Sequence, residues 1–172
     1  MLESTAAEVM VTRFPRIRAD QTLRQAVEAL LRSGWQSGLV LSPSEELSGT
    51  LGRVEVLQAL SKRTGGYFSE EELGFALIRG EVFECELLRE LWRSFWQSPV
   101  SGVMRREVPT VDAGDPVRLA ARRMTAGNDI VAVVRGSRVV GAVRPREVLT
   151  GLVRRPERVR GKRHPRPAPR PA

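Results

Sequence analysis

Two halves of the chain repeat one another, and this repetition constrains the possible folds more than any other feature of the sequence. A shift of 94 residues pairs Val9-Met10 with Val103-Met104, and the same shift pairs Pro15 with Pro109. Further along, the shift falls to 92 residues, because the first copy has a longer connection before that point. Internal repetition of this kind marks two similar structural units that pack on one another.

Both units read in the order strand, helix, strand, strand, helix. In each unit a Pro-containing extended segment precedes a helix that we expect to begin at an acidic cap, Asp20 or Asp115, the latter followed by Pro116. Two short apolar strands and a closing helix follow. The expected ranges are 39–41, 47–51 and 53–62 in the first unit, and 130–134, 138–143 and 145–153 in the second, with a tight turn at Gly136-Ser137. The predicted fold class is therefore α/β, with two such units.

A helical insertion separates the units at residues 63–98 and contains seven of the nine aromatic residues of the chain. The capping-box pattern at Ser69–Glu72 predicts a first helix, and apolar residues at helical spacing predict a second helix that ends before Ser98-Pro99. The aromatic residues either cover a face of the adjacent repeats or form an interface with a second subunit or a partner. The candidate interface residues are Phe83, Trp92, Phe95 and Trp96.

The net charge of +8 lies almost entirely in the C-terminal tail, so it says little about the folded units. Residues 153–172 hold seven arginines and one lysine against one glutamate, together with five of the eleven prolines. A segment with this composition buries too little apolar surface to fold, and we expect 154–172 to be disordered. It either improves solubility or attracts nucleic acid or another anionic surface, without aromatic residues that would stack on bases.

The cysteine and histidine counts exclude several kinds of chemistry. One cysteine, Cys85, permits no intramolecular disulfide framework and fits a reducing compartment. The one histidine, His164, lies in the tail, which leaves neither a zinc site of the usual kind nor a histidine-activated nucleophile on a folded scaffold. No signal peptide is visible, and no apolar run reaches the roughly 18 residues of a membrane helix. These features predict a cytoplasmic, non-enzymatic protein without a metal site.

The repeated order of elements resembles tandem CBS domains, named after cystathionine β-synthase, and the pair resembles the Bateman module. The features that carry the resemblance are Val-Met before a Pro-containing strand, an acidic helix start, and a Gly-hydrophobic strand that turns into the last helix. The expected organisation is an N-terminal extension (1–8), CBS unit 1 (9–62), the insertion (63–98), CBS unit 2 (99–153) and the tail (154–172). The resemblance implies a pseudo-two-fold pair, commonly a homodimer, with clefts that bind adenosine nucleotides in many relatives.

The strand-to-helix corners depart from the pattern of nucleotide-binding relatives, which resembles Gly-hydrophobic-Thr/Ser-x-x-Asp. Gly52 and Arg144 stand at the Thr/Ser position, and Glu55 and Glu147 stand at the Asp position. Helix capping alone explains both glutamates, since each falls three residues after its helix cap. A glutamate can nevertheless accept hydrogen bonds from ribose, and a helix N-terminus favours phosphate. Its arginines make the second corner the stronger anion candidate. The candidate ligand-binding residues are Gly52, Arg53, Glu55, Pro109, Thr110, Arg144, Arg146 and Glu147.

Two hypotheses of function follow from the resemblance and the insertion. The first is a regulatory module that senses an adenine nucleotide or a related ligand, with AMP, ADP, ATP and S-adenosylmethionine as the candidates, and passes the signal to an effector protein. The second is a ligand-free scaffold that dimerises or binds proteins through the aromatic insertion and the basic tail. An enzyme is not expected, because the sequence offers no convincing catalytic constellation.

Overall fold

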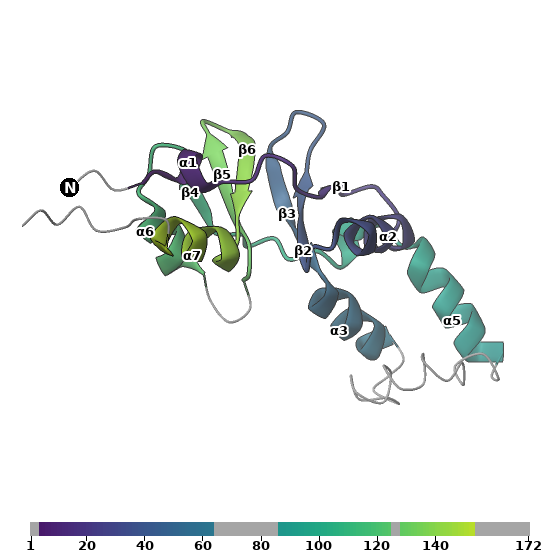
Figure 1. Ribbon diagram of the computed structural model, residues 1–172. Coiled ribbons are helices and arrows are strands. Elements are labelled where there is room, and N and C mark those ends of the chain that lie inside the picture. Colours follow the sequence, from purple (N-terminus) through teal and green to yellow (C-terminus); the bar gives the residue numbers. More distant parts are fainter. Residues whose placement is uncertain (1–3, 64–85, 125–127, 154–172) are drawn as a thin grey trace, which may run out of the picture.

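The computed structural model describes residues 4–63, 86–124 and 128–153 of the chain. These residues form two α/β units, each with a three-stranded sheet, as the repeat predicts (Figure 1). The first unit consists of β1 (Arg16–Arg18), α2 (Leu23–Ser33), β2 (Ser37–Leu41), β3 (Leu47–Gly52) and α3 (Arg53–Arg63). The second consists of β4 (Thr110–Asp112), α6 (Val117–Arg123), β5 (Val131–Arg135), β6 (Arg138–Val143) and α7 (Pro145–Val153).

The two sheets have the same topology, which confirms that the repeat in the sequence is a repeat in structure. In each sheet the first strand runs parallel to the second, and the second runs antiparallel to the third. The turn between β5 and β6 is Gly136-Ser137, as predicted, and Gly136 has a φ of +63° that favours glycine. The predicted strand 130–134 lies one residue further along the chain, at Val131–Arg135.

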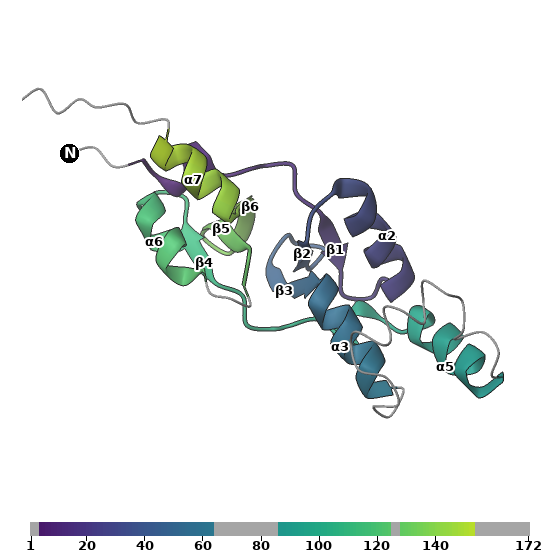
Figure 2. The ribbon, with the colours of Figure 1, turned by 60° about the horizontal axis from the view of Figure 1, so that its bottom comes forward.

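The two sheets face each other in the middle of the molecule, and helices cover their outer faces (Figure 2). Both faces of each sheet therefore carry buried apolar side chains. Leu39 and Leu41 of β2 pack with Ile130 and Ala132 of the other unit, whereas Val40 between them packs against its own helices. Successive side chains of a strand point to opposite faces, so one strand serves both layers. The three core clusters thus comprise one within each unit and one between the units.

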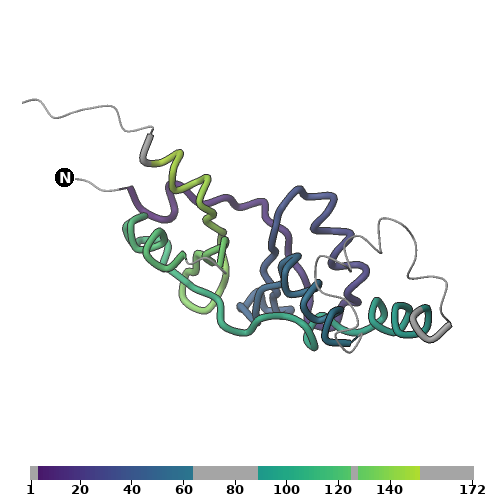
Figure 3. The backbone as a smooth tube through the Cα atoms, turned by 90° about the horizontal axis from the view of Figure 1, so that it is seen from below, coloured from purple at the N-terminus to yellow at the C-terminus, as the bar shows by residue number. Residues whose placement is uncertain are grey.

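The leading segments of the two units are exchanged. Helix α1 (Ala6–Val9) packs on the second unit, where Ala6 is fully buried, and Val11 forms a bridge with Ala142. At the equivalent position Arg105 forms a bridge with Thr50 of the first unit. Figure 3 shows the N-terminal segment beside α7 before the chain crosses to the first unit. The segment expected to be an extension at residues 1–8, as far as it is described, therefore contributes to the second core.

Two helix starts differ from the sequence prediction. Helix α2 is capped by Thr22, whose hydroxyl accepts a hydrogen bond from the Gln25 N–H at 3.3 Å, and not by Asp20. Asp20 instead pairs with Arg18 at 3.0 Å. In the second unit Pro116 is the cap residue and Val117 begins α6, one position later than a cap at Asp115 would give. A hydroxyl followed three residues later by glutamine forms a reciprocal capping box, which explains the choice of Thr22.

The insertion contributes one described helix, α5 (Glu86–Gln97), which ends before Ser98-Pro99 as predicted. Phe95 is 1% exposed and lies in the core of the first unit, with Trp92 and Trp96 partly buried against the same cluster. The Phe95 side chain is therefore buried within its own chain. It is not available to a partner. The first predicted helix of the insertion, Phe83 and Cys85 lie outside the described residues, as does the tail at 154–172.

A glycine in the third strand of each sheet lies against the leading segment of the other unit. A Cβ atom at Gly141 would lie 2.5 Å from Met10 Sδ. A Cβ atom at Gly49 would lie 2.6 Å from the carbonyl oxygen of Arg105 and 3.1 Å from Met104 Sδ. The repeated Val-Met and Gly signals in the sequence are thus two sides of one contact, and it is made between units.

Gly49→Ala is expected to lower the free energy of unfolding by about 1–3 kcal/mol. The added methyl group would collide with backbone, which cannot rotate away as a side chain can, and would disturb the two Thr50–Arg105 backbone hydrogen bonds of 2.8 Å. Urea denaturation measures the change. The matched control is Gly102→Ala, where no described heavy atom lies within 4 Å of the new Cβ. Equal stability of the two variants would contradict the close approach at Gly49.

Candidate functional site

The first corner lies where β3 ends and α3 begins. Glu55 folds back on the helix start, and its Oε2 accepts a hydrogen bond from the Gly52 N–H at 2.9 Å, which confirms the predicted cap. A Cβ atom at Gly52 would lie 2.5 Å from this carboxylate oxygen and 2.7 Å from Ser37 Oγ. Glycine at this position therefore leaves room for the carboxylate to approach the backbone.

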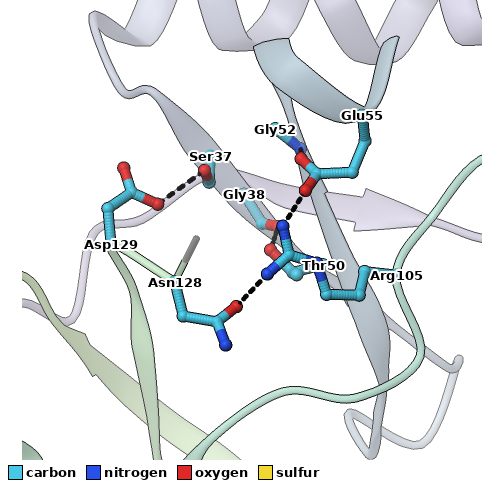
Figure 4. A network of polar contacts seen from close by, with 8 residues as sticks. All are labelled: Ser37, Gly38, Thr50, Gly52, Glu55, Arg105, Asn128 and Asp129. Carbon is cyan, nitrogen blue, oxygen red and sulfur yellow. Dashed lines mark hydrogen bonds and ion pairs between the residues drawn. The ribbon is translucent and has the colours of Figure 1, made fainter. Parts of the chain in front are cut away.

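An arginine from the segment before β4 joins the first corner to the second unit. Arg105 donates one hydrogen bond to Glu55 Oε1, with which it forms an ion pair, and another to Asn128 Oδ1 (Figure 4). The Glu55 side chain is 12% exposed and that of Arg105 is 32% exposed, so the pair is partly shielded from water. The backbone bridge to Thr50 holds Arg105 beside the corner.

A second contact between the units lies close by. Ser37 Oγ donates a hydrogen bond of 2.8 Å to Asp129 Oδ1. The 92-residue shift of the repeat pairs these two residues with each other, so the bond joins equivalent positions. Ser37 begins β2, and Asp129 lies two residues before β5. The two units therefore meet here through equivalent positions of the repeat.

These residues line a pocket of about 300 Å³ between the units. This volume is at the lower end of the range for small-molecule sites. The pocket combines two arginines, two carboxylates, a serine hydroxyl and the first residues of a helix. Such a set offers donors for an anionic group and acceptors for hydroxyl groups. The lining residues are Gln36, Ser37, Gly52, Arg53, Val54, Glu55, Arg105 and Asp129.

The second corner is arranged differently, because Arg144 occupies the position equivalent to Gly52. Glu147 Oε2 accepts hydrogen bonds of 3.0 Å from both the backbone N–H and Nε of Arg144, and Oε1 accepts one of 2.6 Å from the Arg144 guanidinium. The guanidinium carbon lies 3.7 Å from the centre of the Trp35 ring. Burial raises the pKa of the Glu147 carboxyl, but the hydrogen bonds and charge of Arg144 outweigh burial, so its net pKa is below the ordinary value.

The two glutamates are thus neutralised by arginines from different places. Arg105 reaches Glu55 from another segment, and the repeat pairs Arg105 with Val11, which carries no charge. Arg144 reaches Glu147 from within its own corner. The number of arginines in the sequence favours the second corner as an anion site. In the structure Arg144 is engaged with Glu147 and Trp35, whereas Arg53 of the first corner is exposed and lines the pocket.

The structure does not bring all the predicted site residues together. Arg146 and Glu147 line a separate pocket of about 470 Å³ with Ser4 and Glu8. Pro109 lies just before β4, and its carbonyl accepts a hydrogen bond from the Ala132 N–H. Thr110 begins β4, and its carbonyl accepts a hydrogen bond from the Arg123 guanidinium. The residues of the first-corner pocket are Gly52, Arg53 and Glu55 from the predicted set, together with Gln36, Ser37, Val54, Arg105 and Asp129.

The sequence contained one signal for the residues that were missed. Ser37 and Asp129 occupy the same place in the two copies, each just before or at the start of an apolar strand, and are polar at both. Arg105 carried no such signal, because its equivalent is Val11. Across the described residues, no group of three or more His, Cys, Asp and Glu side chains is placed to hold a metal ion. In the same part of the chain, no helix has the length and apolar character needed to cross a membrane.

Comparisons with known proteins agree with the repeated architecture. The family model of the CBS domain matches residues 6–62 and 100–154. A CBS domain-containing protein of unknown function from Bacillus anthracis str. Ames Ancestor is 17% identical, with a TM-score of 0.65 over 88% of this chain and 94% of that one. The CBS-pair protein CBSX2 from Arabidopsis thaliana is 16% identical, with a TM-score of 0.67 over 89% and 96% of the two chains.

The structure of CBSX2 in complex with AMP is also similar, at 16% identity and a TM-score of 0.62, covering 87% of this chain and 96% of that one. No curated protein matches the sequence. Identities this low show a shared fold and carry no function by themselves. The family model, however, matches more than half of the chain, at the same two places where the structure has its two units. This chain therefore belongs to the CBS domain family and carries two CBS units in tandem.

Proposed function

We propose that this chain is a regulatory CBS-pair module that binds an adenine nucleotide or a related ligand in the first-corner pocket, without catalysing a reaction. The observation that carries the proposal is the Glu55 carboxylate, which lies in a pocket of suitable size beside Arg53 and the start of α3. AMP, ADP, ATP and S-adenosylmethionine are the ligands to test, and the AMP complex of the similar protein CBSX2 supports this choice.

The hydrogen-bonding capacity of Glu55 supports the binding of a ribose. An ionised carboxylate has about four lone-pair sites, and the Gly52 N–H and the Arg105 guanidinium use two of them. The remaining capacity matches the two neighbouring hydroxyls of a ribose. The phosphate of the same ligand would find Arg53 and the N–H groups of the first turn of α3, where the helix dipole favours negative charge.

A ligand in this pocket would touch both units, which offers a route from binding to a signal. Ser37, Gly52 and Glu55 come from the first unit, whereas Asp129 comes from the second and Arg105 precedes it. A ligand shifts the angle between the units only to the extent that it binds one arrangement more tightly than another. We propose that the module works as a cytoplasmic homodimer and transmits this shift to an effector protein.

A thermal-unfolding panel with the four ligands tests the proposal. A ligand at about 100 times its Kd stabilises the folded state by about 2.7 kcal/mol, which for a chain of this size raises Tm by roughly 5–10 °C. Glu55→Ala and Arg53→Ala should abolish the shift. Arg24→Ala, which removes an exposed arginine from α2, serves as the control and should retain it. A shift that persists in both pocket variants would place the ligand elsewhere.

The second candidate is a scaffold that binds proteins and no small ligand. The observation that favours it is that Arg105 already neutralises the charge of Glu55 and Arg144 that of Glu147, so neither charge needs a ligand to balance it. Leu57 and Leu149, equivalent residues on the closing helices, are 36% and 60% exposed and offer apolar surface to a second subunit. No thermal shift with any of the four ligands would reject the sensor and favour the scaffold.

A further inference from the structure

The second corner contains a side chain in the space that the pocket occupies at the first corner. At Gly52 the direction of the missing Cβ leads toward Glu55 Oε2 and Ser37 Oγ, two groups that line the pocket. The repeat pairs Gly52 with Arg144, Glu55 with Glu147 and Ser37 with Asp129. The Arg144 side chain therefore enters the region equivalent to the first-corner pocket, and it ends on Glu147 and Trp35.

The contacts of Arg144 use the groups that a ligand would need there. Three hydrogen bonds from Arg144 occupy the Glu147 carboxylate, against two hydrogen bonds received by Glu55 in the described structure. A planar guanidinium also covers the Trp35 ring at 3.7 Å, a distance at which cation–π attraction is strong. The Glu147 side chain is 11% exposed and that of Glu55 is 12% exposed, so the two corners differ in what contacts the carboxylate and not in its exposure.

Displacing Arg144 would be more costly than displacing Arg105 from Glu55. Arg144 would lose its bidentate ion pair and its indole contact together, and its chain position would keep it beside the carboxylate. Arg105 can remain bound to the second unit through Asn128 while a ligand approaches the free side of Glu55. The same acidic position thus faces the pocket between the units at the first corner, whereas at the second it is held by the arginine of its own corner.

We propose that Arg144 is an internal occupant of the second corner, so that each chain binds one nucleotide and not two, and that shortening this side chain uncovers a second site. This inference rests on the proposed nucleotide binding at the first corner. In the sequence the charge of Arg144 suggests that it attracts an anionic ligand. The proposal gives it the opposite role, which is to keep a ligand out of the second corner. The charge is used internally, to hold Glu147.

Equilibrium dialysis with AMP, and separately with ATP, measures the stoichiometry directly. The expected values are about one nucleotide per chain for the wild type, about two for Arg144→Gly and none for Glu55→Ala. The double variant Arg144→Gly with Glu55→Ala should bind about one, at the uncovered second corner. Arg106→Gly, which removes an exposed arginine from a loop, is the matched control and should remain at about one.

The outcomes separate this inference from the proposed function. One nucleotide on both the wild type and Arg144→Gly, or two on the wild type, would overturn the inference and leave nucleotide binding intact. No binding to the wild type but one nucleotide on Arg144→Gly would overturn the first-corner function and support the uncovered site. No binding to either would overturn both.

Acrylamide quenching of Trp35 supplies a readout of the cover that needs no ligand. In a background with Trp92→Phe and Trp96→Phe, Trp35 is the remaining tryptophan of the chain. Trp35 is 7% exposed and its ring lies under the Arg144 guanidinium, so Arg144→Gly should increase quenching, whereas Arg106→Gly should not. Unchanged quenching in Arg144→Gly would overturn the claim that this arginine covers the second corner.

Discussion

Phe95→Ala is expected to lower the free energy of unfolding by about 3–5 kcal/mol, the range typical of removing a buried aromatic side chain. Phe95 is 1% exposed in the core of the first unit, and its ring packs edge-to-face with Trp96, with a centroid distance of 5.3 Å. Because helix α5 is outside the repeated units, this loss would show that the insertion is part of the folded core. Urea denaturation followed by circular dichroism measures the effect.

Leu31→Ala is the control for Phe95→Ala. Leu31 lies on α2 and is 61% exposed, so its truncation should change stability by no more than about 0.5 kcal/mol. Light scattering of both variants separates the two roles considered for the aromatic residues of the insertion. A Phe95→Ala variant of unchanged stability but altered oligomer mass would contradict its place in the core and identify an interface.

Ile130→Ala is expected to lower the free energy of unfolding by about 2–5 kcal/mol. Ile130 is 2% exposed in the cluster between the two sheets, where Leu39 and Leu41 of the other unit also lie. The cavity would therefore weaken the contact between the units, and the surrounding sheets can close it only in part. The same urea titration measures this loss, with loss of signal from both units expected in one transition in the wild type.

Leu31→Ala also tests whether burial between the units is the cause. Leu31 is 61% exposed, so its truncation removes a comparable side chain without opening a cavity. A loss of less than about 1 kcal/mol in Ile130→Ala, or an equal loss in Leu31→Ala, would mean that the two sheets do not share a packed interface.

Much of the fold was predictable because apolar periodicity and turn residues are local signals. The closing helix of the second unit spans Pro145–Val153, as predicted, and the turn at Gly136-Ser137 and the capping roles of Glu55 and Glu147 are confirmed. The packing of Ala6 in the second core depends on tertiary structure, whereas one error was local. An acidic residue before an apolar helix predicts a start at Asp20, whereas the reciprocal bonds between Thr22 and Gln25 determine it.

The candidate site was only partly predictable, because its residues come from four separated segments. Gly52, Arg53 and Glu55 could be found from the corner pattern, whereas Ser37, Arg105 and Asp129 come together only when the units pack. The partner of a charged residue is also not visible in a sequence. Arg144 and Glu147 lie three residues apart, yet neither this spacing nor the charge shows that Trp35 would receive the guanidinium.

From the sequence alone one can derive two equivalent units and their order of strands and helices, since a repeat imposes the same local structure twice. The exchange of leading segments required the tertiary structure, because a chain segment can pack on either unit with the same periodicity. Here Met10 lies against Gly141 and Met104 lies against Gly49, each in the other unit. The same exchange brings Arg105 to Glu55 and leaves Val11 at the equivalent place, so packing makes two similar corners chemically different.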